Sequence, residues 1–201
     1  MLFRSQRADT ILRFTGKARP VGVDDLRLAK ETWRDLAAPT PEAVAERAAR
    51  PEERWPHLRP ALRRFLEELP APGSGLGRTE TTTLQGLAAG PSTATDLFRA
   101  VIAGEEAAFM GDLSFFRILD DLASGRVPLV SGMAPLDETA NTRDYARARL
   151  ELTMAGEDVL AGEDDHIALN GIDRWWGGTR LGKAGVWRYD RRRGRLVAPS
   201  D

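Results

Sequence analysis

The sequence predicts an α+β fold that is mostly helical, and three observations lead to this class. Apolar residues repeat at helical spacing through much of residues 24–124. Residues 76–165 order their predicted elements as helix, helix, helix, strand, loop, strand and helix, which is the order of a winged-helix domain. Residues 185–197 alternate aromatic and charged side chains before a turn signal, as a β-hairpin does. We therefore expect a small N-terminal helical unit, a winged-helix-like domain and a C-terminal β-hairpin.

The composition is that of a globular chain. Of the 201 residues, 42% are apolar and 29% are charged, which is enough to bury a core. The sequence contains no cysteine, so disulfide scaffolds, thiol catalysis and cysteine-ligated zinc are excluded, and a cytoplasmic location is expected. No apolar run approaches the roughly 20 residues that span a bilayer, and the start of the chain does not resemble a signal peptide. We expect no contact with a membrane.

Residues 1–75 are predicted to form the helical unit and a linker. Asp24 or Asp25 would cap a first helix that reaches Ala38, where the Pro-Thr-Pro segment 39–41 ends it and begins a short second helix. One apolar stripe of the first helix would face the core. It consists of Leu26, Ala29, Trp33 and Leu36.

A third helix and the linker complete this unit. The helix would run from His57 to Leu69, where leucines and a phenylalanine repeat at helical spacing. The linker Pro70–Gly75 contains two prolines and two glycines, so we expect it to be exposed and readily cleaved. Residues 1–5 could be encoded by a start codon followed by the end of a common sequencing-library adapter. We hypothesise that these five residues are an artefact and that the natural protein extends further at its N-terminus.

Residues 76–165 carry the predicted winged-helix-like domain. Its first three helices are expected near Arg78–Ala89, after Ser92 or Thr93, and at Asp112–Ser124. Its two strands are expected at 127–130 and at 149–153. The second strand ends on Thr153, which would cap a last helix that Gly162 closes. The core side of the third helix would be formed by Phe115, Ile118, Leu119 and Leu122.

Four stretches of the chain carry a resemblance to a known family. They read LRRFLEELPAPGSGLGRTETTTLQGLAAGP, GDLSFFRILDDLASG, LELTMAGEDVLAG and GIDRWWGGTRL. With them the chain, after about residue 15, resembles the C-terminal part of the uncharacterised bacterial family catalogued as domain of unknown function eighteen-thirty-five. The resemblance implies an architecture and a further N-terminal domain in the family, and it implies no catalytic residue. Gly77 stands where a capping serine would be expected, so the helix after it is expected to begin less firmly.

The charges are distributed unevenly along the chain. Residues 1–75 have a net charge of +3, residues 76–165 of −9 and residues 166–200 of +6. The third helix of a winged helix enters the DNA major groove. Here its outward face would consist of Ser114, Arg117, Asp121 and Ser124, within an acidic segment that duplex DNA would repel. We therefore expect protein contact more than sequence-specific reading of DNA.

The tail, residues 166–201, is basic and aromatic, and we expect it to pack on the winged-helix-like domain. Trp187 and Tyr189 would share one face of a hairpin whose solvated tip holds the three arginines 191–193. At least one of Trp175 and Trp176 should be buried in the core.

The alternative interpretation of the tail is a nucleic-acid grip, in which aromatic rings stack on bases and cations bind phosphates. The residues of this grip would be Arg174, Trp176, Arg180, Lys183, Arg188, Arg191, Arg192, Arg193 and Arg195.

The sequence predicts no catalytic residue, metal site or cofactor. The stretch GGTRLGKA at 177–184 resembles a P-loop, but Ala184 lacks the hydroxyl that binds magnesium, and a strand follows where a helix is needed. His57 and His166 are far apart in the sequence, and the acidic run before His166 is typical of a solvated turn.

Three functions remain open. The first is a non-catalytic binding or regulatory module whose partner is another protein or the N-terminal domain of the longer family members. The second is nucleic-acid binding by the tail. The third is an accessory part of an enzyme whose active site lies in that N-terminal domain.

Overall fold

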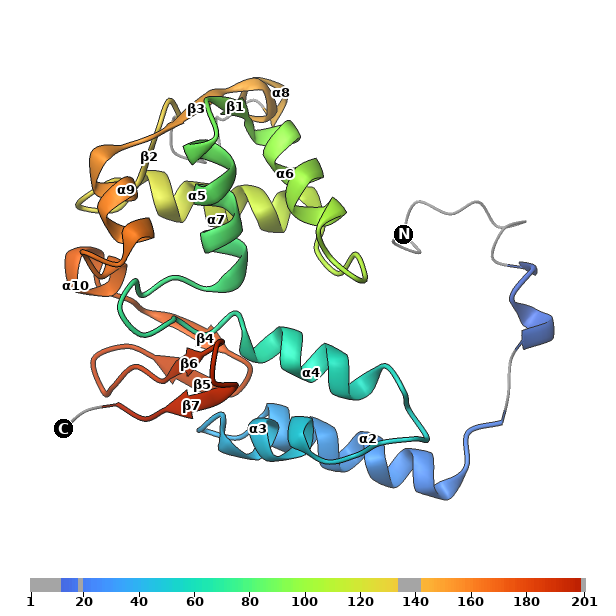
Figure 1. Cartoon of the computed structure of the whole chain (residues 1–201). Coiled ribbons are helices and arrows are strands. Elements are labelled where there is room, and N and C mark those ends of the chain that lie inside the picture. The colour runs from blue at the N-terminus through green and yellow to red at the C-terminus, as the bar shows by residue number, and fades with distance from the viewer. Residues whose placement is uncertain (1–11, 18–19, 134–141, 200–201) are drawn as a thin grey trace.

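The computed structural model describes residues 12–17, 20–133 and 142–199, and these form a mixed α+β fold, as predicted. The hypothesised artefact at residues 1–5 lies outside the described residues. Two lobes lie one above the other (Figure 1). Within the described ranges, no helix is long and apolar enough to cross a membrane.

The lower lobe of Figure 1 combines segments from both ends of the chain. After a short 3₁₀ helix, η2 (Thr15–Lys17), it contains the helices α2 (Val23–Leu36), α3 (Glu42–Ala49) and α4 (Leu58–Leu66) and the strands β4 (Arg174–Trp176), β5 (Thr179–Leu181), β6 (Arg188–Asp190) and β7 (Arg195–Val197). The strands form two antiparallel hairpins, β4 with β5 and β6 with β7. The first of these hairpins was not predicted. One shared core contains Val44, Ala48, Leu62, Leu66, Leu69, Trp176, Leu181 and Tyr189.

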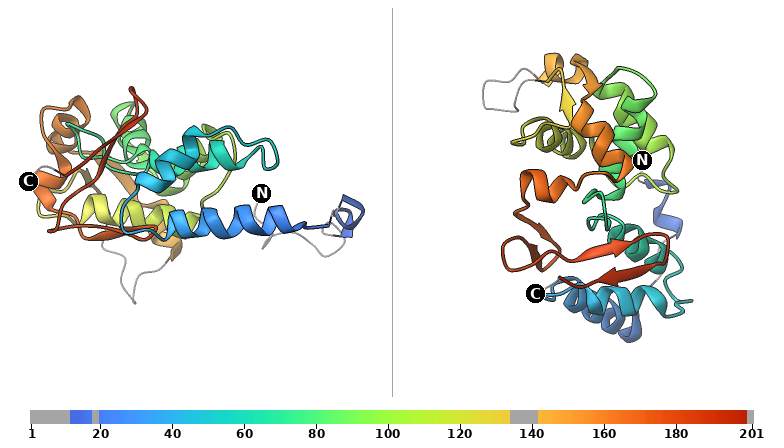
Figure 2. Two further views of the ribbon diagram at one scale, coloured as in Figure 1. Left: turned by 90° about the horizontal axis from the view of Figure 1, so that it is seen from below. Right: turned by 60° about the vertical axis from the view of Figure 1, so that its left-hand side comes forward.

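This shared core changes the expected position of the tail. The tail was expected to pack on residues 76–165, but its buried aromatic and aliphatic side chains pack on α3 and α4. Figure 2 shows the hairpins lying beside these helices. Residues 172–199 therefore complete the N-terminal lobe. Arg174 and Arg191 reach α5 of the upper lobe, and Leu169 and Asn170 of α10 contact the upper lobe as well.

The upper lobe is formed by one continuous segment. Its elements are α5 (Arg78–Ala88), β1 (Ser92–Thr93), α6 (Ala94–Ala103), α7 (Asp112–Ala123), β2 (Val130–Ser131), α8 (Thr142–Arg147), β3 (Arg149–Leu152) and α9 (Met154–Ala161). The three strands form an antiparallel sheet in the order β1-β3-β2. The predicted stripe of α7 lies at the centre of the core, with Phe115, Leu119 and Leu122 buried and Ile118 half-buried against them. The helix α10 (His166–Asn170) then leads back to the lower lobe.

Local capping chemistry determines several helix ends as predicted. The hydroxyl of Thr93 accepts a hydrogen bond from the backbone N–H of Asp96 at the start of α6 (3.1 Å). The hydroxyl of Thr153 accepts one from Gly156 at the start of α9 (3.1 Å), and Gly162 ends α9 in the left-handed conformation (φ 82°).

The start of α5 keeps one half of a capping box. The Glu80 carboxylate accepts a hydrogen bond from the backbone N–H of Gly77 (2.6 Å), but Gly77 offers no hydroxyl to the backbone N–H of Glu80, as expected from the absent serine. A Cβ atom at Gly77 would lie 2.9 Å from the carbonyl oxygen of Glu68. The glycine therefore allows α4 and α5 to approach each other closely, which a serine would prevent.

The predicted inward stripe of α2 is wrong at Leu26 and Trp33, whereas its other two residues, Ala29 and Leu36, are half-buried. Leu26 is 61% exposed and Trp33 is 72% exposed, while Leu36 contacts the core. The N-cap is Gly22, whose N–H donates to the Asp25 carboxylate (3.0 Å). Helical spacing identified an apolar stripe. Ion pairs from Arg47 of α3 to Glu31 and Asp35 hold another side of α2 against the protein, so Leu26 and Trp33 of the stripe face solvent.

The linker Pro70–Gly75 is exposed only at its middle, in Pro72 and Gly73, whereas Pro70, Ala71 and Gly75 at its two ends are buried. The carbonyl oxygen of Pro70 accepts a hydrogen bond from Tyr189 N–H (2.9 Å), so the tail covers the segment. Gly75 has φ 70°, and a Cβ atom there would lie 2.5 Å from the Asp165 carboxylate. The prolines and glycines of this segment, which are typical of a flexible linker, here form a closely packed connection between the lobes.

Candidate functional site

The tail's aromatic residues are used mainly to hold the lower lobe together. Trp176 is 5% exposed and stacks on Phe65, with ring centroids 4.1 Å apart, and its indole N–H donates to the Phe65 carbonyl (3.0 Å). Tyr189 is buried and Trp187 is half-buried against the same core. Only Trp175, 66% exposed, presents its ring to solvent. A base could not stack on Trp176 without unfolding this core.

Three of the tail's arginines, Arg174, Arg188 and Arg191, connect the lobes. Arg174 donates to the buried Glu80 carboxylate (2.7 Å), and Arg188 donates to the carbonyl of Ala71 (2.9 Å) and pairs with Asp165 (2.7 Å). Burial disfavours the charge of Arg174, but Glu80 outweighs it and the pKa of Arg174 is raised. These guanidinium groups are occupied by partners within the chain.

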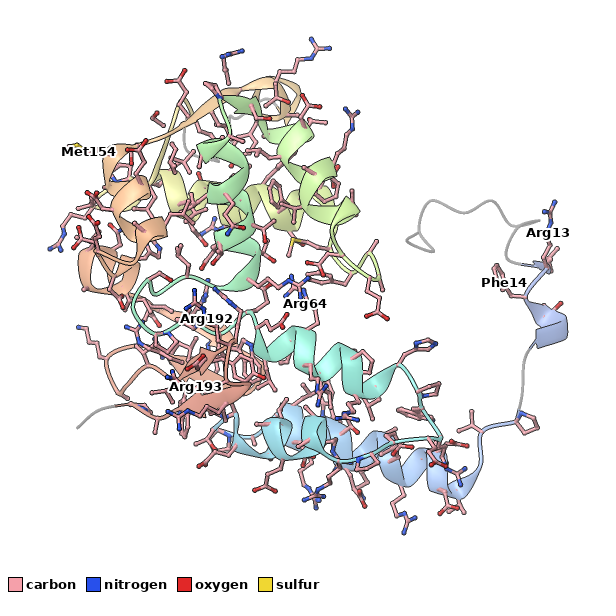
Figure 3. All side chains as sticks on the ribbon, in the orientation of Figure 1. Arg13, Phe14, Arg64, Met154, Arg192 and Arg193 are labelled. Carbon is pink, nitrogen blue, oxygen red and sulfur yellow. The ribbon has the colours of Figure 1, made fainter. Side chains whose placement is uncertain are left out.

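Arg191 does not lie at a solvated tip as predicted. Its guanidinium donates to the carbonyl of Leu76 (3.2 Å) and to the hydroxyl of Thr81 (3.0 Å), which joins β6 to α5. Burial lowers the pKa of this arginine. Arg192 and Arg193, which are labelled in Figure 3, are exposed as predicted.

The remaining tail cations are exposed and dispersed. Arg180 makes a two-pronged pair with Asp173 (3.0 Å each), and Arg193 pairs with Asp190 (2.8 Å), whose pKa the Arg193 guanidinium lowers. Arg192, Arg195 and Lys183 form no ion pair with another described residue. The structure thus separates the nine residues of the predicted grip into buried braces, neutralised pairs and three unpaired cations.

A small polar cleft of about 290 Å³ lies where α5, α7 and α10 approach β4. Its charged and titratable groups include Glu80, Asp121, His166 and Arg174. Burial lowers the pKa of His166, whose Nδ1 lies 3.1 Å from the Asn170 amide, and burial raises the pKa of Asp121. Glu80 and Arg174 neutralise each other.

This cleft lacks the arrangement of a hydrolytic or metal site. Ser124 Oγ is bonded to the Asp120 carboxylate (3.4 Å), not to the histidine. Among the residues that the structure describes, no group of three or more His, Asp and Glu side chains could hold a metal ion. Asp165, in the acidic run before His166, caps α10 by accepting from Ile167 N–H (2.8 Å). The cleft is built as a junction between the lobes.

An exposed apolar surface lies on α2 and includes two residues, Leu26 and Trp33, that the sequence analysis had assigned to the core. Val23, Leu26 and Trp33 are all exposed on this helix. An open hollow of about 760 Å³ on the same side is lined by Trp33 and by the cations Arg27, Lys30 and Arg34. The helical spacing of these residues is visible in the sequence, but the spacing alone does not tell which side of the helix the rest of the protein covers.

Comparison of the chain with protein-family models, with curated proteins and with solved structures gave no match.

Proposed function

We propose that this chain is a non-catalytic protein-contact module. Its upper lobe would be winged-helix-like, a proposal that the helix order and the three-stranded antiparallel sheet support. The resemblance to the C-terminal part of domain of unknown function eighteen-thirty-five belongs to the same proposal. The observation that carries the function is the outward face of α2, where Val23, Leu26 and Trp33 are exposed together.

Two observations favour protein contact over nucleic-acid binding. The outward residues of α7 are exposed as predicted, and the only cation among them, Arg117, pairs with Asp121 (3.4 Å), so this helix offers no free positive charge to phosphates. In the tail, Trp176 is buried and Arg174, Arg188 and Arg191 are bound within the chain.

Photocrosslinking in bacterial cells tests this function. A photoreactive amino acid would replace Trp33 of α2 in one variant and Trp175 of β4 in a matched control. Both positions are exposed tryptophans of the lower lobe, but they lie on different elements. We expect a discrete protein adduct from position 33 only. The captured protein, once purified, should bind the wild-type chain and not Leu26→Ser.

A fluorescence titration with a labelled single-stranded oligonucleotide near physiological salt tests the alternative. We expect weak, salt-dependent binding, since only three unpaired cations remain on the tail. Submicromolar binding that is lost when Arg192, Arg193 and Arg195 are all replaced by serine would make nucleic acid the ligand and would refute the protein-contact function.

A further inference from the structure

Resting on the protein-contact function, we infer that the outward face of α2 binds an acidic amphipathic helix of a partner protein. We define this outward face by Val23, Leu26, Arg27, Lys30, Trp33 and Arg34. Three properties of α2 support the inference. They are the way the helix is attached, the spacing of its exposed residues and the charge of its exposed side.

α2 is attached to the protein mainly by its polar side. Arg47 of α3 pairs with Asp35 and also with Glu31 (3.5 Å), and the indole N–H of Trp55 donates to the Asp25 carboxylate (3.1 Å). Leu36, at the C-terminal end, is the apolar residue of α2 that packs against the core of the lower lobe. A surface helix ordinarily buries its apolar side and exposes its polar side. α2 instead carries apolar residues on both sides, because Leu28, Ala29 and Leu36 are half-buried while Val23, Leu26 and Trp33 stay exposed. The exposed apolar residues are therefore available for another protein.

The exposed residues follow the spacing that pairs one helix with another. Val23, Leu26, Lys30 and Trp33 lie three and four residues apart, as the contact positions of a coiled coil do. Arg27 and Arg34 follow Leu26 and Trp33 by one residue, which places the basic side chains along one edge of the apolar stripe. The 14 residues of α2 extend for roughly 21 Å, enough for two heptads of a partner helix.

The charge of this face favours an acidic partner. Arg27 pairs with Asp24 (3.0 Å), but Lys30 and Arg34 form no ion pair with any other residue that the structure describes. The acids beside this face are already paired within the chain, because Glu31, which borders the hollow, pairs with Arg47 and Asp24 also pairs with Arg54 (3.4 Å). Carboxylates on the flank of a partner helix would complement Lys30 and Arg34 while its apolar residues cover Leu26 and Trp33.

The same features argue against other occupants. A second copy of α2 would bring Lys30 and Arg34 against an identical basic face, so like charges would repel. Single-stranded nucleic acid would find only one aromatic ring, Trp33, with the aliphatic Leu26 beside it. A membrane-surface helix carries basic residues across a broad polar face, whereas the inward side of α2 is acidic and bound to Arg47.

Binding of two designed peptides tests the inference with the full chain. Each labelled peptide would contain about three heptads with leucine at the contact positions, flanked by glutamate in the acidic peptide and by lysine in the basic peptide, so that neither pairs with itself. Fluorescence anisotropy should show binding of the acidic peptide and not of the basic one. Trp33→Ala should lower the affinity for the acidic peptide by about tenfold or more, while Trp175→Ala should leave that affinity unchanged.

A charge reversal gives the sharpest measurement. In the double variant Lys30→Glu, Arg34→Glu, the acidic peptide should lose affinity and the basic peptide should gain it, because both cations are exposed and otherwise unpaired. Circular dichroism should show the helix content and melting temperature of the wild type in Trp33→Ala and in the double variant. This result would separate lost binding from lost folding.

Several outcomes would overturn the inference. Equal binding of both peptides, or no exchange of preference in the double variant, would exclude acidic recognition. Binding to vesicles rich in phosphatidylglycerol, or to a single-stranded oligonucleotide, that is lost in Trp33→Ala would assign the face to a membrane or to nucleic acid. If neither peptide binds but position 33 still crosslinks to a protein, the partner chemistry is wrong and the protein-contact function stands.

Discussion

Replacing Trp176 by alanine should destabilise the protein far more than the same change at its neighbour Trp175. Trp176 is 5% exposed, stacks on Phe65 and satisfies its indole N–H on the Phe65 carbonyl. Removing a buried tryptophan costs about 3 to 5 kcal/mol, and the stacked ring and hydrogen bond place this site in the upper half of that range. Trp175 is 66% exposed, so its removal should cost less than about 1 kcal/mol.

Urea denaturation followed by far-ultraviolet circular dichroism measures this difference. With a denaturant slope of about 2.5 kcal/mol per molar for a chain of this size, Trp176→Ala should lower the midpoint by about 1.6 M. Trp175→Ala should shift it by less than about 0.4 M. Equal shifts in the two variants would refute the conclusion that Trp176, and not Trp175, anchors the β4–β5 hairpin in the core of the lower lobe.

Three further predictions concern the crossing segment, the polar cleft and a close contact in the tail. Limited digestion with a nonspecific protease should spare Pro70–Gly75, because its two ends are buried and its backbone is held by hydrogen bonds, such as that from Tyr189 N–H to the Pro70 carbonyl. A first cut at the exposed Pro72 or Gly73, detected by mass spectrometry of the fragments, would contradict this packing. Because burial lowers the pKa of His166 below the ordinary value of about 6.5 for a histidine, the unfolded chain takes up a proton first as the pH falls. The histidine's contribution to stability should therefore be complete above about pH 6.5 and decrease as the pH falls toward its folded pKa, and thermal melts of His166→Gln should lack this decrease. Gly178→Ala should lower the melting temperature because its Cβ atom would lie 2.1 Å from the carbonyl oxygen of Ala37, whereas Gly16→Ala, with open space around it, should not.

Local chemistry near the helix ends was readable from the sequence. Thr93 and Thr153 each precede a helix and cap it, and Gly162 ends one, because these effects depend on residues within one turn. The buried stripe of α7 was also predictable, since Phe115, Leu119 and Leu122 are the large apolar residues at helical spacing in that segment.

The candidate site was less accessible to sequence reasoning. The tail's aromatic and basic composition is equally compatible with a core anchor and with a nucleic-acid surface, and the burial of Trp176 distinguishes them. The outward face of α2 was missed because an apolar stripe is ordinarily assigned to the core. Its exposure follows from Arg47, on another helix, which binds the opposite side of α2 through Asp35 and Glu31.

By itself, the sequence determined the α+β class, the four helices α5, α6, α7 and α9 of the upper lobe and the caps at Thr93, Thr153 and Gly162, because each depends on spacing within a short segment. It did not predict β1 or α8, and α8 lies in the segment that was expected to be a polar loop. Only the tertiary structure decided that residues 172–199 complete the N-terminal lobe and that the two ends of Pro70–Gly75 are buried. It also decided which side of α2 faces solvent, through Arg47 on another helix. The first two features arise from contacts between residues more than a hundred positions apart, such as Phe65 with Trp176, and no local pattern encodes which distant partner a side chain will meet.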